Sequence, residues 1–123
     1  MDSIQLLKVL AHDKTMRIVA LLLNHELCVC ELEEILDIKQ VNISKHLNKL
    51  KQAGVVDVHK VKQRAFYYLT DMFMQEDYLV NYIRNTIIEE ADYIKDYERF
   101  VQHETTKDET IYVCPSFKKE RLT

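Results

Sequence analysis

Two neighbouring stretches of helical hydrophobic spacing constrain the fold of this chain more than any other feature. Apolar residues recur three and four positions apart over residues 29–36 and again over about 40–53, and the three residues 37–39 interrupt the pattern. The second stretch stops at Gly54, the single glycine of the sequence, and glycine is the residue that most often follows the last turn of a helix. The sequence therefore predicts a helix, a three-residue turn and a second helix.

The hydrophobic period changes from near 3.6 to 2 directly after Gly54. Residues 55–60 (VVDVHK) and 65–69 (AFYYL) are rich in β-branched and aromatic side chains, and a short basic segment joins them. We predict a two-stranded hairpin here. An irregular loop is the alternative, because the turn has no Gly, Asn or Asp.

Helical spacing also marks both sides of this central unit. Residues 3–11 and 15–24 predict two helices, with Asp13 as the cap of the second. Apolar positions continue at spacings of three and four from about 73 to 103, which predicts one helix of roughly 45 Å. Such a helix is longer than a small domain can cover, so the chain is expected to form a homodimer through its terminal helices. We expect a mainly α domain over 1–104 with a small β-hairpin, and a tail over 105–123 that is partly disordered.

Composition narrows the classes of protein that remain. The 123 residues and the 47% hydrophobic share suit one domain with an ordinary core. Neither a membrane span nor a signal peptide is recognisable, so a cytoplasmic location is expected, where three cysteines are unlikely to form a disulfide framework. No glycine-rich phosphate loop and no catalytic spacing of His, Ser and Asp is present, so we expect neither an enzyme nor a small-molecule substrate.

Charge is divided unevenly along the chain. The whole sequence has a net charge of −3, but residues 39–64 carry seven basic side chains and one acidic, a net charge of +6. A basic block of this kind attracts phosphate locally, and the second helix of a helix-turn-helix enters the DNA major groove. The residues expected to contact double-stranded DNA, with Lys51 and Lys60 as further phosphate contacts, are Gln40, Val41, Asn42, Ser44, Lys45, His46, Asn48, Lys49, Lys62 and Arg64.

The same segments carry a family resemblance over about residues 4 to 69. The stretches LLKVLAHDKTMRIVALLL, ELCVCELEEILDIKQVNISKHLNKLKQAGVV and AFYYL resemble the ArsR/SmtB family of winged helix-turn-helix metal sensors. The most specific part is ELCVCEL followed at a fixed distance by VNISKHLNKLKQAG. The resemblance implies a dimeric transcriptional repressor that binds a palindromic operator and leaves it when a toxic metal or metalloid binds to the thiolates of Cys28 and Cys30.

The spacing of these two cysteines suggests how binding could act. Side chains two positions apart in an unbroken helix point about 200° from each other, so their sulfurs cannot share one ion. Ligation is therefore expected to distort the first turn of the helix over residues 29–36 and to loosen DNA binding. The helix N-terminus is also expected to lower the thiol pKa values.

The identity of the effector stays open at this point. Arsenite or antimonite is favoured, with Cys114 as the third sulfur ligand, because these ions prefer three sulfurs. Alternatively, His25 and Glu26 join Cys28 and Cys30 around zinc, cadmium or lead. Glu33 stands where some arsenic sensors have a third cysteine, and residues 72–102 contain no histidine. A thiol-redox or persulfide sensor and a protein-interaction module are the remaining hypotheses.

Overall fold

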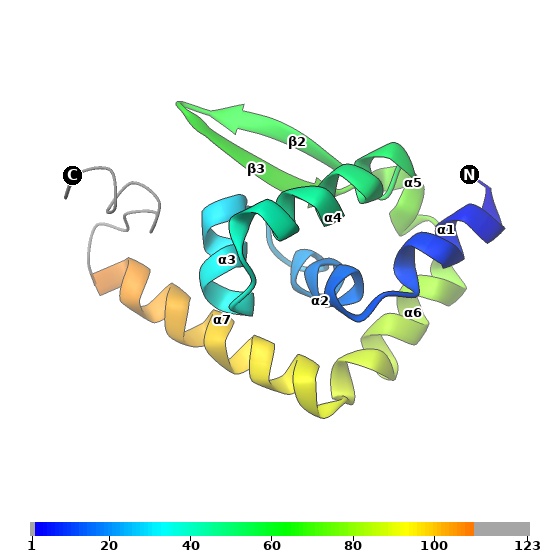
Figure 1. Ribbon diagram of the computed structural model, residues 1–123. Coiled ribbons are helices and arrows are strands. Elements are labelled where there is room, and N and C mark those ends of the chain that lie inside the picture. Colours follow the sequence, from blue (N-terminus) through cyan, green and yellow to red (C-terminus); the bar gives the residue numbers. More distant parts are fainter. Residues whose placement is uncertain (1, 110–123) are drawn as a thin grey trace.

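The computed structural model describes residues 2–109 of the chain. Helices surround a central helix, and a narrow β-ribbon projects from the helical body (Figure 1). The elements in chain order are α1 (Ser3–Leu10), α2 (Asp13–Leu22), β1 (Leu27–Cys28), α3 (Val29–Leu36), α4 (Gln40–Gln52), β2 (Val56–Val61), β3 (Arg64–Leu69), α5 (Asp71–Met74), α6 (Asp77–Asn85), the 3-10 turn η1 (Ile87–Glu89) and α7 (Ala91–Glu109).

The predicted helix-turn-helix is confirmed as α3 and α4. The turn between them begins at Asp37, which adopts a left-handed conformation with φ 55°, a conformation that Asp tolerates better than most residues. After α4, Gly54 has φ 80°, and the Val55 N–H donates to the Leu50 carbonyl at 2.9 Å. The only glycine therefore ends the second helix as predicted and turns the chain into the ribbon.

The predicted hairpin is also confirmed, with a turn that the sequence did not signal. Strands β2 and β3 pair from Val56 opposite Leu69 to Val61 opposite Arg64. Lys62 takes the left-handed conformation at the tip, with φ 59°, where glycine or asparagine is more usual. The sheet has a third strand that the sequence analysis missed, because β1 is only two residues long and pairs with the distant β3 in the order β1-β3-β2.

The second helix begins differently from the prediction. Its N-cap is His12, whose ring Nδ1 accepts a hydrogen bond from the Lys14 backbone N–H at 3.2 Å, whereas Asp13 is the first residue inside α2. Asp13 still lies in the first turn, where a carboxylate is favourable for the helix dipole. The second predicted helix is therefore present, but the prediction that Asp13 caps it was wrong.

The single long helix expected over about 73–103 is interrupted. The chain instead forms α5, α6, η1 and α7, and α7 continues past residue 103 to Glu109. The main break lies at Thr86, Ile87 and Ile88, three β-branched residues in succession, which have low helix propensity. The bend lets both Ile83 and Phe100 reach the core, which a straight helix of this length could not do.

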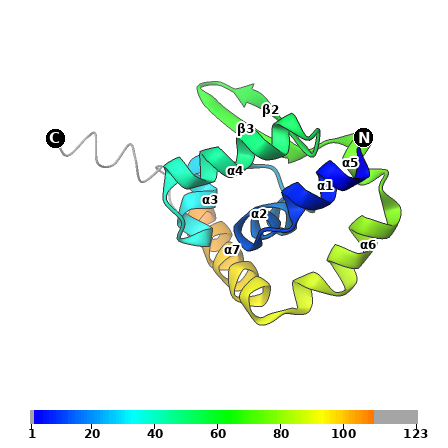
Figure 2. The same ribbon diagram turned by 45° about the vertical axis from the view of Figure 1, so that its right-hand side comes forward.

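Helices α6 and α7 form a bent arm around α2, and α7 passes beside α3 (Figures 1 and 2). Arg17 of α2 donates from Nε and Nη2 to the two carboxylate oxygens of Asp96 on α7, both at 2.8 Å. Arg17 and Arg99 also donate to the backbone carbonyls of Leu36 and Glu34, which lie in the last turn of α3. These contacts fasten α7 to the helix-turn-helix.

One hydrophobic core joins the arm to the helix-turn-helix. It is built from residues of every helix from α1 to α7 and includes the fully buried Ile18, Leu32, Ile43, Leu47, Leu50, Phe73 and Ile83. Within residues 2–109, no helix combines the length and the apolar character that crossing a membrane requires. The division into 1–104 and 105–123 and the cytoplasmic location stay predictions, and residues 110–123 lie outside the described part.

Candidate cysteine site and DNA interface

Cys28 occupies the junction between the helix-turn-helix and the β-ribbon. It ends strand β1 opposite Phe66 of β3, and it is the N-cap of α3, with φ −88° and ψ 166°. Its backbone is thus extended, and the helical segment begins only at Val29. The expected distortion of the first helical turn assumed that Cys28 and Cys30 are both helical and therefore point about 200° apart. That assumption is wrong, because Cys28 lies outside the helix.

The Cys28 thiol is buried and lies against an arginine of the ribbon. Cys28 is a free cysteine with 5% of its surface exposed. The Arg64 Nη2 donates to its Sγ at 3.1 Å, and the Arg64 guanidinium lies 5.7 Å from the ring centre of Phe66. The thiol therefore contacts the first residue of β3 directly.

Burial raises the pKa of the Cys28 thiol, contrary to the prediction from the helix N-terminus. A hydrogen bond that the Cys28 sulfur accepts from the Glu31 backbone N–H and the nearby charge of Arg64 act in the opposite direction but do not offset the loss of hydration. The sequence could not show this, because β1 and its pairing with β3 are what bury the thiol.

The other predicted ligands differ in their surroundings. Cys30 lies in the first turn of α3 and is half-buried, and Cys114 lies outside the described residues. His25 is exposed and stacks on Phe100 with ring centres 4.3 Å apart. Glu26 contacts the ribbon instead, with its Oε2 lying 2.9 Å from His59 Nε2. The structure does not bring His25 and Glu26 to Cys28.

A buried acid and base beside Cys28 were missed by the sequence analysis. Glu31 Oε1 accepts from the Cys28 backbone N–H at 3.3 Å, and Glu31 Oε2 lies 2.9 Å from His103 Nε2. In the sequence, a glutamate in the first turn of a helix indicates only a favourable interaction with the helix dipole. No local signal could have paired it with a histidine 72 residues away.

The predicted base-reading residues lie on helix α4, next to the ribbon (Figure 1). Ile43, Leu47 and Leu50 are buried beneath it, so the opposite face is turned outward. The outward residues include amide and ammonium groups of the kind that bind base edges and phosphates. Exposed are Gln40, Val41, Lys45, Asn48, Lys49 and Lys51, and half-buried are Asn42, Ser44 and His46.

His46 has a contact on the protein itself. Its Nδ1 lies 3.2 Å from Thr15 Oγ1, and its ring centre lies 4.8 Å from that of His12. Burial lowers the pKa of His46, and the neighbouring His12 and lysine charges act in the same direction. His46 therefore braces α4 against the start of α2, and its contact with DNA stays a prediction.

The ribbon tip carries the remaining predicted phosphate contacts. Lys60 and Lys62 are exposed near the turn, whereas Arg64 is half-buried against Cys28. Lys45 and Lys49 of α4 are exposed as well, so α4 and the ribbon both present cations. Only Arg64 connects this basic surface to a thiol among the described contacts.

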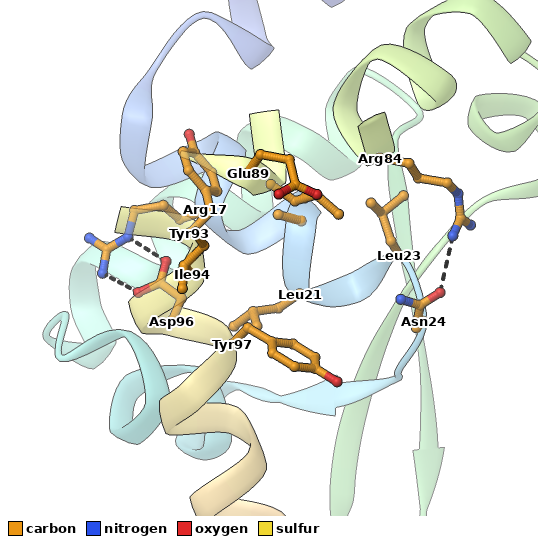
Figure 3. A pocket seen from close by; sticks show the side chains of 12 residues that line it. Arg17, Leu21, Leu23, Asn24, Arg84, Glu89, Tyr93, Ile94, Asp96 and Tyr97 are labelled. Carbon is orange, nitrogen blue, oxygen red and sulfur yellow. Dashed lines mark hydrogen bonds and ion pairs between the residues drawn. The ribbon is translucent and has the colours of Figure 1, made fainter. Parts of the chain in front are cut away.

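A partly apolar groove of about 440 Å³ lies away from the cysteines, between α2 and the arm (Figure 3). The Arg17–Asp96 ion pair stands at one end, and Arg84 Nη1 donates to Asn24 Oδ1 at 3.2 Å at the other. Between them lies the exposed Tyr97 side chain. The groove contains no predicted DNA or metal residue.

Comparison with known proteins agrees with this architecture. The family model described as "Bacterial regulatory protein, arsR family" matches residues 13–58, which include α2, the cysteine pair, α3 and α4. The solved structure of the transcriptional repressor BigR from Xylella fastidiosa is 33% identical with a TM-score of 0.59, and the match covers 69% of this chain and 84% of that one. The chain belongs to the arsR family.

The family's winged helix-turn-helix fold therefore identifies the β2–β3 ribbon as the wing. A cadmium resistance transcriptional regulatory protein from Listeria innocua is 39% identical over 66 residues, which are 53% of this chain and 56% of that protein. An arsenic resistance transcriptional regulator from Pseudomonas putida is 40% identical over 63 residues, which are 50% and 49% of the two chains. The chain thus spans only about half the length of these curated relatives. The family is one of transcriptional regulators and not of enzymes, as predicted.

Proposed function

We propose that this protein is a DNA-binding transcriptional repressor that releases its operator when a thiophilic metal or metalloid binds at Cys28 and Cys30. The observation that carries this proposal is the position of Cys28, which caps the first helix of the helix-turn-helix and contacts Arg64 of the wing at 3.1 Å. A change at this thiol therefore acts directly on the wing and reaches α4 through α3, which packs against it. The cadmium and arsenic regulators among its relatives support an effector of this class.

The DNA interface combines α4 in the major groove with the wing on the adjacent backbone. Gln40, Lys45 and Asn48 are exposed on α4 and supply the hydrogen-bonding groups. Lys49, Lys60 and Lys62 bind phosphates and make the affinity dependent on salt.

A homodimer supplies two such surfaces to a palindromic operator. Large apolar side chains are exposed on α1 and along the arm, and exposed apolar groups are buried in many protein interfaces. These residues are Ile4, Leu7, Tyr78, Tyr82, Ile94, Tyr97 and Val101. A second copy placed on this surface would cover the groove of Figure 3, because Ile94 and Tyr97 line it.

Arsenite or antimonite is the favoured effector, and cadmium, lead and zinc are the alternatives. The donors suit such an ion, because thiolate sulfur selects soft and thiophilic metals. The extended backbone of Cys28 frees its side chain from the helical separation that would keep the two sulfurs apart. Cys114 remains the predicted third ligand from outside the described residues.

Release follows from what Cys28 gives up. A Cys28 sulfur that binds a metal must move to satisfy the geometry of the ion, which changes or breaks its 3.1 Å contact with Arg64 in the buried junction. Strand β1 pairs with β3 at Cys28 and Phe66, so a displacement of Cys28 also reaches the wing through the sheet. Typical coupling of about 1–3 kcal/mol would weaken operator binding about 5- to 150-fold.

The test is a titration of the fully reduced protein on DNA from upstream of its own gene, followed by fluorescence anisotropy. Arsenite, antimonite, cadmium, lead and zinc are added separately to wild type, Cys28→Ser and Cys30→Ser. We expect release by at least one thiophilic ion in wild type and none in Cys28→Ser. Affinity that does not change with salt would refute DNA binding, and equal release from Cys28→Ser would refute the site.

A thiol-redox sensor of the same fold is the second candidate, because it would use the same contact between Cys28 and Arg64. Oxidation of Cys28 would also change the size, polarity or position of the sulfur group beside Arg64. Release by peroxide or persulfide, with Cys–Cys bonds detected by mass spectrometry and no response to metals, would favour this alternative.

A further inference from the structure

A cluster of ionisable side chains lies where α7 passes the start of α3. Among residues 2–109, one group of three His, Cys, Asp or Glu side chains lies close enough to hold a single ion, namely Glu31, His103 and Glu104. Their ligand atoms all lie within 4.8 Å of one another. The side chains of Glu31 and His103 are 1% and 3% exposed, so the group is enclosed by protein on two sides.

The buried histidine is held in the orientation of a metal ligand. Its Nε2 lies 2.9 Å from Glu31 Oε2, while its Nδ1 lies 3.4 Å from Glu34 Oε2 on the next turn of α3. Histidines that bind metals through one ring nitrogen almost always donate the other N–H to a carboxylate or carbonyl, which fixes the tautomer. Glu34 is placed for this second role.

The Glu31 carboxylate is oriented in the same way. Its Oε1 accepts the backbone N–H of Cys28 at 3.3 Å, which leaves Oε2 directed at the histidine. Ligating carboxylates are commonly fixed by such outer hydrogen bonds. Both buried ligands therefore have a supporting partner, which a surface cluster of acidic residues lacks.

We propose that Glu31, His103 and Glu104 bind one divalent cation of the zinc class, at a site separate from the thiols. One imidazole nitrogen and two carboxylate oxygens suit zinc, which accepts three protein ligands and a water. Arsenite, by contrast, requires sulfur. Binding through Nε2 displaces the proton between Nε2 and Glu31 Oε2 to solvent, and the remaining ring proton stays on Nδ1, facing Glu34.

The cation would join two helices that are far apart in the sequence. Glu31 belongs to α3 and the other two ligands to α7, so the ion would strengthen a junction of these helices that Arg99 already fastens at the end of α3. The bound form should therefore unfold at a higher temperature than the metal-free form. This site does not depend on the effector site proposed for Cys28.

The test uses the full chain with Cys28, Cys30 and Cys114 all replaced by serine, which removes every thiolate. The protein is stripped with a chelator and titrated with cobalt(II), which reports ligation by visible absorption, and zinc is then added to displace the cobalt. We expect one equivalent of each ion, no thiolate-to-metal charge-transfer band, and a rise in melting temperature with zinc. Adding Glu104→Gln should weaken binding at least tenfold.

Glu104 is half-buried, so its substitution tests the site without emptying the core. His103→Gln is the stronger variant, and Glu104→Gln alone decides the result if His103→Gln does not fold. His25→Gln is the matched control, because His25 is exposed and contacts Phe100 instead of the cluster. The proposal is overturned if the serine protein binds less than one equivalent, if Glu104→Gln binds as tightly as its parent, or if His25→Gln weakens binding equally.

Discussion

Replacing Arg64 by methionine tests the link between the thiol and the wing. Methionine has a similar length and no donor, so the variant loses the 3.1 Å contact from Nη2 to Cys28 Sγ and keeps most of the packing on Phe66. Hydrogen bonds that involve a charged group contribute about 1.5–3 kcal/mol, and a weak sulfur acceptor with a half-buried donor lowers this to about 1 kcal/mol. If the coupling between effector and operator binding falls by this amount, the ratio of the operator Kd with effector to the operator Kd without effector falls about fivefold.

The assay is operator binding by fluorescence anisotropy with and without a saturating effector. We expect the effector to raise the operator Kd of both proteins. The factor by which it rises should be about fivefold smaller for Arg64→Met than for wild type. Lys62→Met is the matched control, because it removes a cation from the exposed tip of the same wing without any contact to Cys28. It should lower the affinity and its salt dependence but leave the effector ratio unchanged. Equal ratios in Arg64→Met and wild type would refute the proposed link.

Three further predictions concern stability and assembly. Asp96→Asn should lower the free energy of unfolding by about 2–3 kcal/mol, because it weakens a mostly buried, bidentate ion pair with Arg17. Urea unfolding measures this loss, and a loss below about 0.5 kcal/mol would contradict the prediction. Because the pKa of His46 is lowered in the folded protein, the unfolded chain binds a proton at this residue at higher pH than the folded protein does. The free energy of unfolding should therefore fall as pH decreases through about 6.5. His46→Gln should flatten this part of the stability–pH profile, and an unchanged slope would exclude His46 as the cause. Tyr97→Lys should shift the protein from dimer to monomer in analytical ultracentrifugation, and an unchanged dimer would place the interface elsewhere.

The sequence predicted the elements whose signals are local. The periodicity that buries Ile43, Leu47 and Leu50 is contained within α4, and Gly54 marks its end without any tertiary contact. The alternating pattern of residues 55–69 likewise predicted the wing. Helix α4 and the wing could be predicted because the sequence pattern of each is contained within the segment that forms it.

Elements set by distant contacts could not be predicted in this way. Strand β1 is two residues long, and only its pairing with Tyr67 and Phe66 makes it a strand. The arm bends at Thr86 although the apolar spacing continues through it, because three β-branched residues weaken the helix there and the packing of Ile83 and Phe100 on one core favours the bend. For the site, the cysteines were visible in the sequence, but the burial of Cys28 and its contact with Arg64 depend on that unpredicted strand.

Hydrogen exchange of the backbone amides, with and without effector, tests most directly whether Cys28 acts on the wing. The account predicts that effector binding to the reduced wild type speeds exchange in strand β1 and in the residues of β3 opposite it, Phe66 and Tyr67, and that Cys28→Ser shows no such change. Release of the operator by wild type with unchanged exchange at this pairing would contradict the account.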